Sequence, residues 1–270
     1  MRRWGLWSAY PGRVRPIRGA WRWVPGALAI GLVLLVWWVA SASGLVAPVL
    51  LPDPVGVASR AVNWALDGVL TRYLLPTLTS AALGSLIAAV VAIPLGILMA
   101  HSRLMAAVAE PFVAFSQTIP LVAFAPLLVL WIGYGTIPIA ILCAVIAFFP
   151  MLTTTLVGLR NLDARIIEHA VLDGVTWWRG LLQVELPIAA PAIMAGVRAG
   201  VVLSMTGAIV GEFVMGGSGL GTLLTISRQS TDTVGMFAVL VWIAITALVL
   251  QGTVQMGERA TRQRLQGESS

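Results

Sequence analysis

The chain has 270 residues, of which 59% are hydrophobic and only 10% are charged, and its formal net charge is +6. Soluble domains carry roughly 25% charged residues, so this composition excludes an ordinary water-soluble protein. The positive charge comes from arginine alone, because the sequence contains no lysine.

Long stretches without Asp, Glu, Arg or His indicate helices that cross a membrane, for which about 20 apolar residues suffice. These stretches cover residues 23–52, 73–100, 111–159 and 233–257. The third stretch is long enough for two passes, with a turn at Gly133-Tyr134-Gly135. Residues 188–215 add an apolar run whose only charged residues are Arg198 and Glu212. We therefore predict an all-α integral membrane protein with six spans, at residues 24–43, 75–100, 111–132, 136–158, 190–214 and 235–257. The first span is too long an apolar run for a cleaved signal peptide.

The distribution of arginines predicts how the chain is oriented. Of the 17 basic residues, Arg60, Arg72 and Arg228 fall in one set of loops, Arg198 falls within a span, and the others fall in the opposite loops and the termini. Because cytoplasmic loops carry the excess of basic residues, we expect both termini and the loop at 159–187 in the cytoplasm. The excess of basic residues then lies along the cytoplasmic surface of the membrane, and it does not indicate a nucleic-acid-binding site. We expect a cytoplasmic tail at 1–23, a transmembrane domain at 24–257 and a second cytoplasmic tail at 258–270.

The sequence lacks the residues that most enzyme sites require. Without lysine there is no phosphate-loop ATPase site, and the glycine-rich run at 216–221 follows no strand, so we interpret it as a flexible turn. His101 and His169 lie in separate loops without an i, i+4 partner, which argues against a metal site. A single cysteine, Cys143, allows no internal disulfide. We expect no catalytic residue, no metal and no cofactor.

The same scarcity bears on how transport would be driven. Proton- or ion-coupled carriers place ionisable relays within the membrane, whereas only the fifth predicted span contains charged residues, Arg198 and Glu212, toward its opposite ends. Energy for uphill transport would then have to come from a partner protein.

Residues 164–187 form a polar elbow between two apolar runs. Asp163 is a suitable N-cap, and an apolar stripe of helical period follows it, ending at Gly174, a residue that commonly stops a helix. Thr176 can begin a second short helix, which we expect to end at Pro187. Helices of about ten residues are marginal alone, so this helix–glycine–helix elbow is expected to pack into a groove of another protein.

The spacing in this elbow resembles a known motif. Glu168-His169-Ala170, Gly174 and Val184-Glu185-Leu186-Pro187 are similar to the cytoplasmic "EAA" motif of binding-protein-dependent ABC importer permeases. Further segments resemble the nitrate/sulfonate/taurine subfamily: Leu51-Pro52-Asp53-Pro54, Ile119-Pro120, Pro126-Leu127, Trp131 to Gly135, Phe148-Phe149-Pro150, Gly211-Glu212-Phe213 and Ser218 to Gly221. His169, Asp173 and Gly180 depart from the usual pattern.

The resemblance implies a type I ABC-importer permease architecture and assigns roles to residues. An ATPase subunit would dock on the cytoplasmic coupling region 159–189, which contains the elbow. The residues that would contact it are Glu168, His169, Ala170, Asp173, Gly174, Leu186 and Pro187. His101 and Arg103 would supply a secondary contact with that subunit. Glu212 would form an outer gate or contact the binding protein, or its side chain would instead reach to the membrane interface.

The resemblance also implies partners and a substrate class. The chain would pair with a second permease chain as a homodimer in the bacterial inner membrane, receive substrate from a periplasmic or lipid-anchored binding protein, and leave ATP hydrolysis to the ATPase partner. The substrate would be a small anion of the sulfonate, taurine or nitrate class; a thiamine-pyrimidine precursor, riboflavin or an aromatic acid is the alternative. From the residues alone, an ATP-independent carrier or channel and an ordinary inter-span loop at 164–187 stay open.

Overall fold

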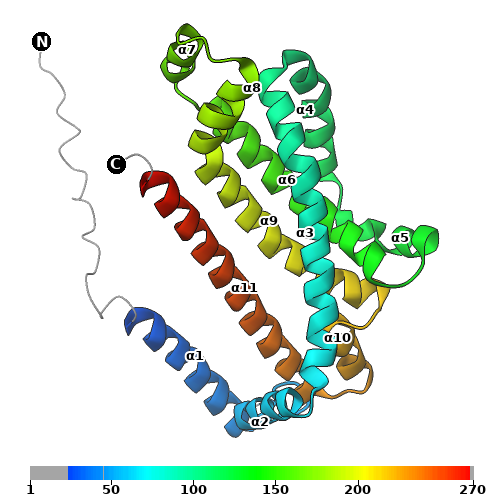
Figure 1. Cartoon of the computed structure of the whole chain (residues 1–270). Coiled ribbons are helices and arrows are strands. Elements are labelled where there is room, and N and C mark those ends of the chain that lie inside the picture. The colour runs from blue at the N-terminus through cyan, green and yellow to red at the C-terminus, as the bar shows by residue number, and fades with distance from the viewer. Residues whose placement is uncertain (1–23, 45, 268–270) are drawn as a thin grey trace, which may run out of the picture. The chain divides into compact units, whose positions relative to one another are not determined.

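The computed structural model describes residues 24–44 and 46–267, and these residues form helices joined by turns, without a strand among them (Figure 1). The helices are α1 (Val24–Ala42), α2 (Pro54–Leu66), α3 (Val69–His101), α4 (Arg103–Thr118), η2 (Leu121–Phe124), α5 (Ala125–Ile132), α6 (Thr136–Arg160), α7 (Ala164–Leu172), α8 (Trp177–Gly180), η3 (Leu181–Glu185), α9 (Leu186–Met215), α10 (Leu220–Gln229) and α11 (Thr233–Gly267). The tail predicted at 1–23 lies outside the described residues. The chain divides into two compact units, Met1–Gly56 and Val57–Ser270.

The first unit contains α1, a helix of 19 residues that is long and apolar enough to cross a membrane. None of its residues is buried within the structure. The Trp37 indole N–H donates a hydrogen bond to the Pro52 carbonyl oxygen at 3.0 Å, which ties the helix to the turn that follows it. The apolar surface of α1 therefore suits a lipid environment.

The core of the second unit lies where α3, α6 and α9 pack together. Small residues allow the backbones to approach closely, as membrane helices commonly do. A Cβ added at Gly84 of α3 would lie 2.7 Å from the Ala140 carbonyl oxygen of α6 and would overlap the Cys143 side chain. At Gly200 of α9 it would lie 2.5 Å from the Met151 methyl group. These crossings fix the three long helices against one another.

The six-span prediction agrees with the helices in number, but one span is broken. Within residues 24–44 and 46–267, five helices are long and apolar enough to cross a membrane, and the pair formed by α4 with η2 and α5 makes the sixth if it counts as one span. The span predicted at 111–132 is not one straight helix, because the two parts of this pair meet at 84°. Pro120 cannot donate a backbone hydrogen bond and holds Ile119 in an extended conformation, with ψ at 130°.

The predicted turn between the third and fourth spans is confirmed, whereas the end of the last span is not. The turn at Gly133-Tyr134-Gly135 separates α5 from α6, and both glycines adopt positive φ, 95° and 135°. At the far end, α11 continues to Gly267 and so runs through most of the residues expected as a tail from 258. The helical backbone there extends the sixth span beyond the apolar stretch.

Side-chain contacts join α2 to α11. The Arg60 guanidinium forms an ion pair with Asp232 at 2.7 Å, and the Trp242 indole N–H donates to the Ala61 carbonyl oxygen at 3.0 Å. In the second unit, α10 lies at the opposite end of the long helices from α7 and α8 (Figure 1).

Candidate functional site

The elbow begins with α7, whose first turn is capped as the sequence predicts. Asp163 Oδ1 accepts a hydrogen bond from the Arg165 backbone N–H at 3.0 Å. At the other end Gly174 adopts φ of 74°, and the Val175 N–H donates to the Ala170 carbonyl oxygen at 3.1 Å. A left-handed residue here reverses the chain after α7, and glycine adopts this conformation without steric cost.

The second half of the elbow differs from the prediction. Pro187 does not end a separate short helix, because α8, η3 and α9 form one apolar stretch of 39 residues from Trp177 to Met215. The π-helical segment η3 makes this possible: the Leu186 N–H donates to the carbonyl oxygen of Leu181, five residues earlier. Pro187 then lies in the first turn of α9, where a missing N–H is tolerated. Thr176 occupies the N-cap position of α8 without a side-chain hydrogen bond.

The elbow exposes both apolar and polar side chains. Leu172 is 81% exposed and Trp178 is 64% exposed. Glu168, His169 and Asp173 are also exposed, whereas Ala170, Leu186 and Pro187 are half-buried. Exposed apolar side chains rimmed by polar ones mark surfaces that bind another protein or the membrane.

The two residues predicted as a secondary contact lie in different settings. Arg103 is exposed at the start of α4. His101, the last residue of α3, pairs with Glu185 of η3 at 2.7 Å, and its ring is perpendicular to the Trp177 ring. Neither Glu185 nor Trp177 is among the predicted site residues. Glu185 lies 84 residues from His101 in the sequence, so no local pattern shows this contact.

Glu212 lies inside the helix bundle and not on a surface. It is 1% exposed, and its Oε2 accepts hydrogen bonds from the Thr77 hydroxyl at 3.0 Å and the Gly221 N–H at 2.9 Å. The carboxylate is thus buried in this conformation, and its roles as an outer gate or a contact with the binding protein stay predictions. The glycine-rich run at 216–221, expected as a flexible turn, packs closely against it: a Cβ at Gly221 would lie 2.8 Å from the Glu212 Cβ.

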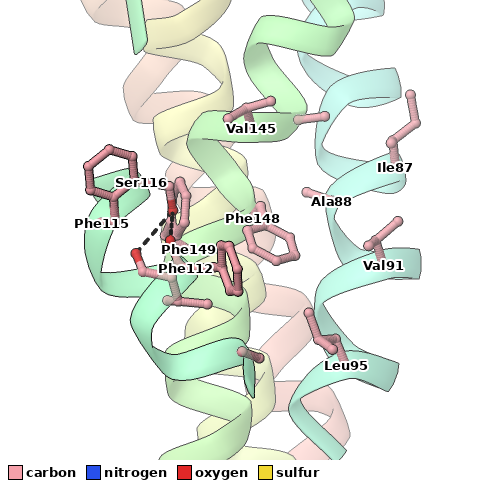
Figure 2. A pocket seen from close by; sticks show the side chains of 13 residues that line it. Ile87, Ala88, Val91, Leu95, Phe112, Phe115, Ser116, Val145, Phe148 and Phe149 are labelled. Atoms are coloured by element: carbon pink, nitrogen blue, oxygen red, sulfur yellow. Dashed lines mark hydrogen bonds between the residues drawn. The ribbon is translucent and has the colours of Figure 1, made fainter. Parts of the chain in front are cut away.

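An apolar cavity of about 640 Å³ opens between α3, α4 and α6 (Figure 2). It is lined by Ile87, Ala88, Val91, Leu95, Ala109, Phe112, Val113, Phe115, Ser116, Ala144, Val145, Phe148 and Phe149. The Ser116 hydroxyl donates to the Phe112 carbonyl oxygen at 2.8 Å, so its polarity is satisfied within α4. No lining residue carries charge, and the cavity therefore offers nothing that would bind an anion tightly.

The described residues contain no group of three or more His, Cys, Asp and Glu side chains that could hold a metal ion. Cys143 is fully buried in α6. It packs in the core against α3 and α9.

Comparison with known proteins decides the family. Residues 92–263 match the family model described as "Binding-protein-dependent transport system inner membrane component". The chain belongs to this family. The permease is 38% identical over 249 residues to the riboflavin transport system permease protein RibX of Chloroflexus aurantiacus, covering 92% of each chain. It is 30% identical to a putative aliphatic sulfonates transport permease protein, SsuC, of Bacillus subtilis, covering 92% of this chain and 90% of that one.

Solved structures show that the permease shares the fold of this transporter class. Inward-facing conformations of the methionine ABC transporter MetNI match with a TM-score of 0.64 at 20% identity, covering 73% of this chain and 98% of that one. The chain is thus a type I ABC-importer permease, a multi-pass inner-membrane transport subunit.

Proposed function

We propose that two copies of this permease enclose a translocation path. Separate ATPase subunits would bind the elbow at 164–187 and drive transport through this contact. The observation that carries the proposal is the position of the elbow. The elbow exposes Leu172 and Trp178. It lies at one end of the helical stretch that runs from Trp177 to Met215. A displacement of the elbow would move this helix lengthwise through the bundle.

The packing of α9 supports transmission of such a movement. The helix contacts α3, α6, α10 and α11, and its glycines let α6 approach closely at Gly196 and Gly200. Interfaces of this kind have discrete packed arrangements and do not deform continuously. ATP-driven closure of the ATPase subunits would shift the bundle between an inward-open and an outward-open arrangement.

We assign Glu168, His169, Ala170, Asp173 and Gly174 to the surface that the ATPase subunit covers, with Leu186 and Pro187 joining it to α9. Arg103, exposed beside the same end of α3, stays a candidate secondary contact. On this proposal the elbow and both termini lie in the cytoplasm, and a periplasmic or lipid-anchored binding protein delivers substrate to the opposite face.

For the substrate we propose a small organic or inorganic anion of the sulfonate, taurine or nitrate class. The relatives named for aliphatic sulfonates and for taurine, the latter TauC of Escherichia coli at 28% identity, support this class. Riboflavin is the second candidate, because the relative named for riboflavin transport is 38% identical over the same share of the chain. An uncharged apolar cavity fits a path that leaves selection to the binding protein. A thermal-shift screen of that protein against taurine, alkanesulfonates, nitrate and riboflavin distinguishes the two.

The substitution Gly174→Pro tests the coupling role. Gly174 has φ of 74°, whereas proline fixes φ near −65°, so the reversal after α7 cannot form. We expect the variant to insert into the membrane but to lose ATP-driven uptake. The matched control is Gly180→Ala, at a helical residue whose nearest neighbour to an added Cβ is 4.0 Å away. Full uptake by Gly174→Pro with a normally assembled ATPase would contradict the docking role, and absence of any copurifying ATPase would favour an ATP-independent carrier.

A further inference from the structure

The His101 side chain joins three separate parts of the permease. Its Nδ1 lies 2.9 Å from the Ile97 carbonyl oxygen of α3, and its Nε2 lies 2.7 Å from Glu185 Oε2. Its ring also packs perpendicular to the Trp177 ring, with centroids 5.9 Å apart and an interplanar angle of 86°. The end of α3 is thereby connected to the first residue of α8 and the last residue of η3.

Both ring nitrogens of His101 lie within hydrogen-bond distance of an oxygen, one of the Ile97 carbonyl and the other of the Glu185 carboxylate. Both oxygens are acceptors, and a ring nitrogen donates to its oxygen when it carries a hydrogen. A hydrogen bond to a carboxylate is stronger than one between neutral groups.

This pair is also better shielded than the other ion pairs of the described residues. The side chains of His101 and Glu185 are 23% and 13% exposed. Those of Arg60 and Asp232 are 41% and 30% exposed, and those of Arg160 and Glu110 are 44% and 51% exposed. Exposed pairs contribute little because water screens them, so His101–Glu185 is the pair best suited to hold a fixed geometry.

We infer that His101 and Glu185 form a latch that fixes the elbow to α3, so that a movement of the elbow reaches α3 as well as α9. The latch bridges the π-helical segment η3, whose i, i+5 bonding marks the irregular part of the connection between α8 and α9. Without the latch, the elbow would be attached to the bundle through that segment and the loop before α7. His101 and Glu185 are thus positioning residues, and their part in coupling rests on the function proposed above.

Spin labels test the latch directly. The labels go on Leu98→Cys of α3 and Leu172→Cys of α7, which are both exposed, while the native Cys143 is fully buried and stays unlabelled. In complexes carrying one labelled copy, we expect a single narrow distance that is the same with and without ATP–vanadate. His101→Ala and Glu185→Ala should each lose the narrow distance, and the double variant should lose no more than either alone. Glu185→Gln keeps an acceptor oxygen and should retain most of it. Gln183→Ala, an exposed position on the same segment, is the matched control.

Either of two results would overturn the latch: an unchanged distance in His101→Ala, or additive broadening in the double variant. Copurification of the ATPase subunit separates this outcome from failure of the proposed function. We expect the single variants to retain the ATPase, because the exposed face of α7 is untouched, and to lose ATP-driven uptake. If the unsubstituted permease recruits no ATPase, the proposed function fails, while the distances in the permease alone still decide whether the latch exists.

Discussion

The Thr77 hydroxyl and the Glu212 carboxylate, 135 residues apart in the sequence, are hydrogen-bonded at 3.0 Å inside the bundle. Thr77 also accepts a hydrogen bond from the Leu220 N–H at 2.8 Å, and Glu212 accepts one from the Gly221 N–H. These bonds join α3, α9 and the first turn of α10 at the end of the molecule opposite the elbow. The pair therefore holds the end of the long helix α9 that the elbow does not reach.

Replacing the Glu212 carboxylate should lower the stability of the helix bundle. Glu212→Ala leaves the Gly221 N–H without its acceptor, which costs roughly 1–3 kcal/mol for an unpaired buried group, whereas the Thr77 hydroxyl can still donate to the Tyr73 carbonyl oxygen at 3.2 Å. Glu212→Gln keeps one acceptor oxygen in the same position and should be milder. Thermal unfolding of the purified variants in detergent measures both. Equal unfolding temperatures for Glu212→Ala and the unsubstituted protein would contradict a role in holding the helices together.

Close packing of α3 on α6 gives a second prediction. Gly84→Ala would place a methyl group 2.7 Å from the Ala140 carbonyl oxygen and against Cys143, and overpacking of this kind costs about 1–3 kcal/mol. We expect a lower unfolding temperature and a lower yield of inserted protein. The control is Gly252→Ala in α11, where an added Cβ meets nothing within 4 Å. If both variants unfold alike, the helices do not approach as closely at Gly84 as described.

Asp232 has two roles that can be separated. Its Oδ2 pairs with Arg60, and its Oδ1 accepts a hydrogen bond from the Gly235 N–H at 2.9 Å, as an N-cap of α11 does. Loss of an N-cap costs about 1 kcal/mol, while a partly exposed ion pair is worth at most about 1 kcal/mol. We expect Asp232→Ala to destabilise more than Arg60→Ala, and Asp232→Asn to match Arg60→Ala because asparagine also caps. Denaturant titration ranks the three, and a larger effect of Arg60→Ala would reverse the assignment.

The sequence predicts those features of the permease that are local. The spans follow from uninterrupted apolar stretches, and the cap at Asp163 and the reversal at Gly174 follow from residues within one or two turns of each other. Pro120 shows the limit: Pro94 and Pro150 lie inside continuous helices, whereas Pro120 breaks one. Whether a proline interrupts a membrane helix depends on what neighbouring helices supply to its freed carbonyl, and that is not a local property.

Features that depend on contacts between residues far apart in the sequence cannot be predicted from local patterns. His101 looked like an exposed loop residue because Glu185, its partner, is 84 residues away. No local pattern shows that Glu212 accepts a hydrogen bond from Thr77, 135 residues away. The continuity of α8 with α9 was missed because Pro187 usually ends a helix, and only the π-helical register of η3 removes that conflict.

The proposed function depends most on direct contact between the elbow and the ATPase subunit, and one cross-linking measurement tests this contact. A photoreactive maleimide placed on Leu172→Cys, 81% exposed on α7, is compared with one on Leu66→Cys, 78% exposed at the end of α2. We predict that the label at position 172 captures the ATPase subunit in native membranes, with a yield that changes on adding ATP, and that the label at position 66 does not. Labelling of position 172 from the outside of intact cells, or capture of the ATPase from position 66 alone, would contradict the account.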